Sequence, residues 1–399
     1  MTRDLPRHLI AARALRAFAD GYVAILLPAY LLALGLGTWQ VGILATSTLL
    51  GSALATLAVG AWGHRVHHRR LLLGAAWLMT STGLAFAAMP ATSSAFGPLL
   101  LIAFVGTLNP SSGDVSVFLP LEHARLAEAA QGEARTALFA RYSLTGALCA
   151  AIGALASGLP DRLVLLTGLA RVDALRTMFV LYGLIGFIVW LLYRRLPAPH
   201  VDEVLTPPAP LRESKAIVLK LAALFAVDSF ASGLTINALM ALWLLQRFGL
   251  SLSATGLFFM WVGLLSALSQ LAAPWLARRI GLLNTMVFTH IPASLCLIAA
   301  AFAPSMAWAL GLLLMRSLLS QMDVPARSAF VMSVVTPAER AAAASFTAVP
   351  RSLASALGPT LGAALFATGW LAAPLVLCGA LKVAYDLALW RAFRAQQLA

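Results

Sequence analysis

The stretch Leu219–Leu245, LKLAALFAVDSFASGLTINALMALWLL, is a run of 27 residues in which only Lys220 and Asp228 are charged. About 20 apolar residues are enough to cross a bilayer. The run therefore predicts a transmembrane helix with Asp228 deep in the hydrocarbon. A carboxylate at that depth costs about 2.5–3.5 kcal/mol on insertion scales. We therefore expect Asp228 to face the protein interior or a water-filled cavity.

A second aspartate with similar neighbours lies near the N-terminus. Asp20 lies within residues 18–22, FADGY, and Asp228 lies within residues 226–230, AVDSF. Both segments place the aspartate before a small residue and an aromatic. Two buried aspartates in matching helices of two halves indicate a transporter with a central site.

The composition belongs to the membrane class. Of the 399 residues, 61% are hydrophobic and 11% are charged, and long apolar runs recur throughout. The first ten residues are polar and lead directly into an apolar segment, so we expect no cleaved signal peptide. Apolar runs of spanning length occur at residues 11–34, 40–62, 71–90, 96–118, 136–159, 175–193, 216–245, 253–276, 282–303, 305–324, 341–367 and 370–390.

One polar segment divides these twelve runs into two sets of six. Arg194–Lys215, RRLPAPHVDEVLTPPAPLRESK, holds five prolines and seven charged residues, which is typical of a linker. The sequence predicts an N-terminal six-helix half (1–195), a cytoplasmic linker (196–214) and a C-terminal six-helix half (215–399). Pro110 and its polar neighbours should also break the fourth span.

The distribution of Lys and Arg predicts the orientation in the membrane. With both termini inside, 19 of the 28 Lys and Arg residues, Arg16 among them, fall at cytoplasmic ends, and four fall outside. The remaining five lie within spans. We therefore expect an inner-membrane protein with both termini cytoplasmic, whose net charge of +13 reflects topology rather than nucleic-acid binding. Residues 160–176 carry three arginines outside, and we expect an amphipathic helix on the outer surface there.

Several short motifs occur along the chain. Their residues are Asp20, Gly21, Pro28, Gly35, Gly37, Gly60, Arg65, Arg69, Arg316, Gln321, Asp323, Pro325, Arg327, Pro337, Glu339, Arg340, Gly358, Pro359 and Gly362, the last three of which form a Gly-Pro-x-x-Gly element. With these residues the chain resembles the major facilitator superfamily over essentially its whole length, and the first span resembles the twelve-helix drug:proton antiporter branch. The loop after the second span keeps part of the superfamily pattern Gly-x-x-x-Asp-Arg-x-Gly-Arg-Arg, with His64 in place of the aspartate.

The resemblance implies an all-α membrane fold of twelve transmembrane helices in two six-helix halves. It also implies that spans one and seven line a central cavity, where Asp20 and Asp228 would bind protons or a cationic substrate. Burial disfavours the charged form of a carboxyl. The alternative for each aspartate is a salt bridge that only stabilises the bundle. Further candidates for the substrate or proton site are Tyr22, Asn237 and Arg316, and Arg316 is equally compatible with a structural ion pair.

In the superfamily, charges at the cytoplasmic ends of spans form latches that hold one half against the other. The resemblance therefore implies a conformational latch at Asp114 and Asp323. The basic candidates for the same latch are Arg65, Arg327 and Arg340.

Three further expectations concern pairing. Within its own helix, the cation nearest to Asp228 is Lys220, about 12 Å away along the axis, so Asp228 should be lightly paired. Lys382 and Asp386, four residues apart, should neutralise each other. His290 falls in the ninth span, which is usually peripheral in the superfamily, and receives no role.

The expected function is proton-coupled efflux of small amphipathic compounds by alternating access. The alternatives are uptake or export of an anionic metabolite held by Arg316, and a non-transporting membrane sensor on the same fold. No phosphate-binding loop, nucleophile elbow or metalloprotease motif is present, so we expect no enzyme, no cofactor and no metal site. The expected partners are a small-molecule substrate, protons and membrane lipids, and the protein should be a monomer.

Overall fold

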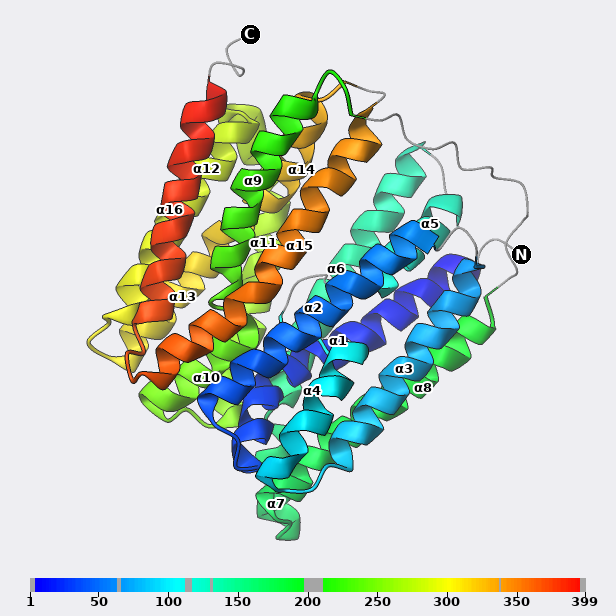
Figure 1. Cartoon of the computed structure of the whole chain (residues 1–399), viewed down its shortest axis with the longest axis vertical. Helices are drawn as coiled ribbons and strands as arrows, with labels where there is room; N and C mark the ends of the chain where they lie inside the picture. Colours follow the sequence, from blue (N-terminus) through cyan, green and yellow to red (C-terminus); the bar gives the residue numbers. More distant parts are fainter. Residues whose placement is uncertain are drawn as a thin grey trace. The chain divides into compact units, whose positions relative to one another are not determined.

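The computed structural model describes residues 4–62, 66–111, 117–129, 132–196, 211–336 and 339–394. Within these ranges the chain forms sixteen α-helices and one short 3-10 helix, with no strand (Figure 1). Nine helical stretches of the described residues are long and apolar enough to cross a membrane. The expected all-α membrane class is therefore confirmed. The number of twelve spans stays a prediction.

Two compact units can be distinguished, and each is described by itself. The helices of the first unit are α1 (Asp4–Ala33), α2 (Thr38–Trp62), α3 (His68–Ala87), α4 (Phe96–Val105), α5 (Phe118–Ala129), α6 (Gly132–Ala156), α7 (Leu159–Thr167), α8 (Arg171–Arg194), α10 (Asn237–Phe248) and α11 (Leu252–Ile280) as far as Met260. The second unit contains α9 (Lys215–Gly233), the rest of α11, α12 (Leu282–Ala301), α13 (Met306–Ser320), α14 (Asp323–Ser333), α15 (Arg340–Ala367) and α16 (Ala373–Phe393).

Three of the predicted spans do not match one continuous helix. The seventh is divided into α9 and α10, whereas the fourth and the tenth end where a second helix, α5 or α14, begins. The break after α4 was expected from Pro110, and there the side-chain oxygen of Asn109 accepts hydrogen bonds from the amide and hydroxyl of Ser111. Because the break after α9 places α10 in the first unit, the units differ from the expected halves at this point.

Close helix contacts in both units depend on glycine. In the first unit, a side chain at Gly21 of α1 would collide with the backbone of α6. In the second, Gly233 of α9 and Gly358 of α15 meet backbone to backbone, and these two helices lie side by side (Figure 1). Gly358 belongs to the Gly-Pro-x-x-Gly element of the sequence, so that element provides a tight crossing next to the end of α9.

A carboxylate from another part of the second unit holds the N-terminal end of α9, which we expect on the cytoplasmic side. Glu339 accepts backbone N–H hydrogen bonds from Arg212 (2.6 Å), Glu213 (3.0 Å) and Ser214 (2.9 Å), directly before α9 begins. These three donors lower the pKa of the Glu339 carboxyl to about 2. The carboxylate therefore holds the turn that leads into α9 and satisfies the amide of Ser214, the N-cap residue. Most of the expected linker, residues 197–210, lies outside the described residues.

The outer segment does begin with a helix, as the sequence predicts. Helix α7 starts with Pro160 in its first turn and ends at Gly168, which has a φ of +70°. Leu165 and Leu166 are 84% and 83% exposed. An apolar pair with this exposure is typical of an interfacial helix, and its contact with lipid stays a prediction.

Candidate functional site

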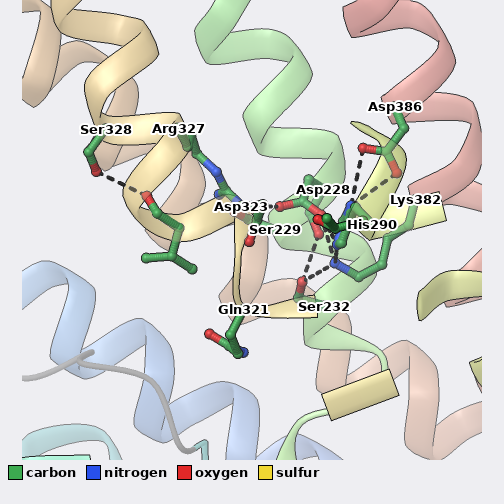
Figure 2. Close-up of polar contacts among 12 residues, drawn as sticks. Asp228, Ser229, Ser232, His290, Gln321, Asp323, Arg327, Ser328, Lys382 and Asp386 are labelled. Atoms are coloured by element: carbon green, nitrogen blue, oxygen red, sulfur yellow. Dashed lines mark hydrogen bonds and ion pairs between the residues drawn. The ribbon is translucent and has the colours of Figure 1, made fainter. Parts of the chain in front are cut away.

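Asp228 lies at the centre of a buried network of charges in the second unit (Figure 2). It is on α9 and is 3% exposed. Its Oδ1 atom is 2.7 Å from the Nζ atom of Lys382 on α16, and its Oδ2 atom is 3.3 Å from Nη2 of Arg327 on α14. The expectation of a lightly paired carboxylate is therefore wrong, because both cations come from other helices.

Lys382 is fully occupied as a donor. Besides Asp228, its ammonium donates to the hydroxyl of Ser232 at 2.7 Å and lies 3.4 Å from Nε2 of His290. An ammonium has three donors, and these three atoms account for them. The expected pair of Lys382 with Asp386 is wrong, because Asp386 bonds to His290 instead.

His290 of α12 lies between two buried aspartates, as Figure 2 shows. Its Nδ1 atom is 3.1 Å and 3.0 Å from the two carboxylate oxygens of Asp386, and its Nε2 atom is 3.9 Å from Oδ1 of Asp228. Since Nδ1 faces carboxylate oxygens, it carries the ring proton, and Nε2 then accepts from Lys382. The residue left without a role in the sequence thus connects Asp228 to Asp386.

Arg327 extends this network toward α14. It forms an ion pair with Asp323, four residues earlier on the same helix, and contacts Asp228 with the same Nη2 atom. Its guanidinium also lies over the ring of Phe225, 5.4 Å from the centroid. Nearby, Arg351 of α15 donates to the hydroxyl of Ser229 at 3.3 Å. Asp323 and Arg327, predicted as latch residues, are therefore part of the same network as Asp228.

The other predicted site residues are distributed over both units. In the first unit, the hydroxyl of buried Tyr22 donates to the carbonyl of Met178 at 3.1 Å, while Asp20 on α1 and Asn237 at the start of α10 are half-buried. In the second unit, Arg316 is half-buried on α13.

Among the remaining latch candidates, Arg340 donates from Nε to the carbonyl of Met332 at 3.1 Å. Asp114 and Arg65 lie outside the described residues.

A second buried charge cluster, which the sequence reasoning missed, lies in the first unit. Glu122 of α5 is fully buried and forms an ion pair with Arg16 of α1. It also accepts hydrogen bonds from Tyr142 of α6 and, at 2.7 Å, from Tyr193 of α8. The sequence analysis placed Arg16 at a cytoplasmic end, whereas the residue is 2% exposed. Glu122 thus joins four helices through one carboxylate.

The described residues contain no group of three or more His, Cys, Asp or Glu side chains suited to hold a metal ion. The second-unit network instead alternates acids and bases in hydrogen-bonding reach. Such an arrangement can bind, pass or release a proton, and each change of protonation alters which helices are held together.

An all-helical membrane fold with broken spans and buried ion pairs is typical of a secondary transporter. The chain belongs to the Major Facilitator Superfamily, whose sequence profile matches residues 9–322. It is 25% identical over 427 residues to an uncharacterized membrane protein of Saccharomyces cerevisiae, with 97% of this chain and 93% of the yeast protein covered.

Two solved structures share the fold along the whole chain. A bacterial homologue of the human lysosomal transporter Spinster matches with a TM-score of 0.74 at 17% identity, covering 97% of this chain and 96% of its own. A D-xylose–proton symporter matches with a TM-score of 0.73 at 15% identity, covering 96% and 97%. These likenesses establish the fold, and the choice of substrate, coupling ion and direction depends on the site.

Proposed function

We propose that the protein is a proton-coupled secondary transporter, and that the network of Asp228, Lys382, His290 and Asp386 is its coupling site. The observation that carries the proposal is the position of His290 between two buried aspartates and against a lysine. Imidazole is the side chain that ordinarily changes charge between pH 5 and 8. Ionisable groups inside membrane spans are costly and generally serve transport or proton relay.

The geometry supports a specific coupling step. With His290 neutral, Nδ1–H donates to Asp386 and Nε2 accepts from Lys382. A proton bound at Nε2 turns this atom into a donor, so it no longer accepts from the ammonium. The imidazolium and the ammonium then repel each other, and the acceptor within reach of the new N–H is Oδ1 of Asp228, 3.9 Å away. His290 thus competes with Lys382 for Asp228.

This competition links proton occupancy to helix packing. Lys382 and Asp386 are on α16, His290 is on α12 and Asp228 is on α9. Loss of the Lys382–Asp228 contact removes the ion pair between α16 and α9 and leaves the hydrogen bond of Lys382 to Ser232, while His290 bonds α12 to α9. Two hydrogen-bonding patterns of one buried network are the kind of bistable element that alternating access requires.

For direction and substrate, the resemblance of the first span supports export of small amphipathic compounds. The shared fold of a D-xylose–proton symporter shows that proton coupling is compatible with this architecture. On the basis of the Lys and Arg distribution, we propose that both termini are cytoplasmic. The inner membrane and a monomeric state remain expectations.

The test uses purified protein in liposomes with an imposed pH gradient. Three probes share the naphthalene ring system and differ in charge. They are anionic 2-naphthalenesulfonate, neutral 2-naphthalenesulfonamide and cationic trimethyl(2-naphthyl)ammonium. We expect the unaltered protein to accumulate at least one probe against its gradient. His290→Gln should abolish this accumulation but retain exchange of the probe between the two sides.

His67→Gln is the matched control, because His67 is exposed before α3 and its side chain makes no capping hydrogen bond there. Proton-driven accumulation at the normal level by His290→Gln, or no accumulation of any probe by the unaltered protein, contradicts the proposal.

A further inference from the structure

Two arginines of the second unit lie half-buried in the middle of their helices. They are Arg316 on α13 and Arg351 on α15. A charge within a membrane span is costly unless it has a partner, so an anion is stabilised next to an arginine that lacks one.

Arg316 is the one of the two for which the described residues provide no partner. Arg327 and Lys382 both contact carboxylates, and Arg351 donates to a hydroxyl. For Arg316, the structure gives no hydrogen bond and no ion pair among the residues it describes. All five N–H donors of a guanidinium are therefore available on a half-buried side chain about halfway along the expected tenth span.

The position of Arg316 connects it with the Asp228 network. It follows buried Leu313 by three residues and precedes buried Ser317 on α13, so it lies near the inward face of that helix. The carboxylate of Asp228 is close enough to act electrostatically on its guanidinium. A ligand held by Arg316 therefore lies within the field of the coupling site.

From this geometry we infer that Arg316 binds the anionic group of the transported substrate, which is a small amphipathic anion carrying a carboxylate, sulfonate or phosphate. A guanidinium presents a planar fork of donors that matches these groups in bidentate fashion. A cationic substrate would be repelled by the guanidinium of Arg316 instead of neutralising it. The inference rests on the proposed transport function and narrows the substrate class of the same site.

The test measures binding without transport, so that the two proposals can fail separately. Purified protein is titrated calorimetrically with 2-naphthalenesulfonate, 2-naphthoate and 2-naphthyl phosphate, and with the neutral and cationic naphthalene probes. We expect at least one anion to bind more than tenfold more tightly than the neutral and cationic probes. Arg316→Gln should reduce that affinity at least tenfold, and Arg316→Lys should reduce it less because the charge remains.

The control is Arg247→Gln, since Arg247 is exposed in the last turn of α10, and it should leave binding unchanged. Because Arg316 makes no ion pair with the described residues, Arg316→Gln should fold normally, and an unchanged unfolding temperature checks this. Binding of no anion, preference for the cation, or unaltered anion affinity in Arg316→Gln overturns the inference. If an anion binds and this binding depends on Arg316, but no probe accumulates under a proton gradient, only the proposed coupling is contradicted.

Discussion

Replacing Asp228 by Asn tests the buried network directly. The substitution leaves the ammonium of Lys382 with only neutral partners, namely the new amide, a hydroxyl and an imidazole, while Arg327 keeps its pair with Asp323. Removing one partner of a buried ion pair costs about 3–5 kcal/mol, because the other charge stays buried and uncompensated. Since only one of the two cations loses its last carboxylate, we expect Asp228→Asn to lower the free energy of unfolding by about 3 kcal/mol, the low end of this range.

A double-mutant cycle separates the ion pair from other effects. Lys382→Met removes the stranded charge, so Asp228→Asn combined with Lys382→Met should be more stable than the sum of the single changes, with a coupling energy of about 1–3 kcal/mol. Reversible unfolding in mixed detergent micelles gives the four free energies.

Asp173→Asn is the control, because Asp173 pairs with Arg176 at 2.8 Å but is 51% exposed. An exposed pair of this kind contributes about 0–1 kcal/mol. The reasoning is refuted if Asp228→Asn is as stable as Asp173→Asn. It is also refuted if the changes in unfolding free energy of the two single variants add up to that of the double variant.

Four more outcomes are expected. Glu122→Gln should lower the free energy of unfolding by about 3–5 kcal/mol, since it leaves Arg16 buried without its carboxylate; chemical unfolding measures this, and a change below about 1 kcal/mol argues against it. Glu339→Ala should accelerate amide hydrogen exchange at residues 212–214 at least tenfold, because these amides lose the carboxylate that caps them. Unaltered exchange rates would contradict a capping role of Glu339. Because the pKa of Glu339 is lowered to about 2, the cap is fully present above about pH 4.5 and is lost as the pH falls toward 2, so protection of these amides should not change between pH 5 and 8. Reporter fusions at Ala399 and within the linker should be active on the cytoplasmic side, and a periplasmic signal reverses the orientation. The affinity for the anionic probe should rise as the pH falls from 8 to 5.5, and it should not rise in His290→Gln. An affinity that decreases as the pH falls would instead support exchange of the anion for a proton.

The helices and the central aspartate could be predicted from sequence because the information is local. Hydropathy over about 20 residues marks a span, and a lone carboxylate within such a run must avoid lipid. Asp228 is accordingly 3% exposed. The break at Pro110 was predictable for the same reason, since proline lacks the N–H that a helix needs.

The pairing of the charges could not be predicted in this way. Lys382 lies 154 residues from Asp228 in sequence, and Glu122 lies 106 residues from Arg16. Each of these residues is unusual for its apolar surroundings, but neither periodicity nor spacing within one helix indicates a partner on another. Within one helix, the nearest charge to Asp386 is Lys382, and Asp228 has none within reach, so the sequence predicts the wrong partner for Asp386 and a lightly paired Asp228.

The charges of the two ligands also relate the substrate to the proton. A proton on His290 adds a positive charge next to Asp228, and an anion at Arg316 adds a negative charge in the same unit. Opposite charges in a region of low dielectric constant stabilise each other strongly, so each ligand should favour binding of the other. Two ligands that favour each other cross in the same direction, whereas an exporter that exchanges its substrate for a proton needs them to compete. The anion inferred at Arg316 therefore favours uptake together with the proton over the export that the first span suggests, and export applies only to a substrate that competes with the proton for Asp228.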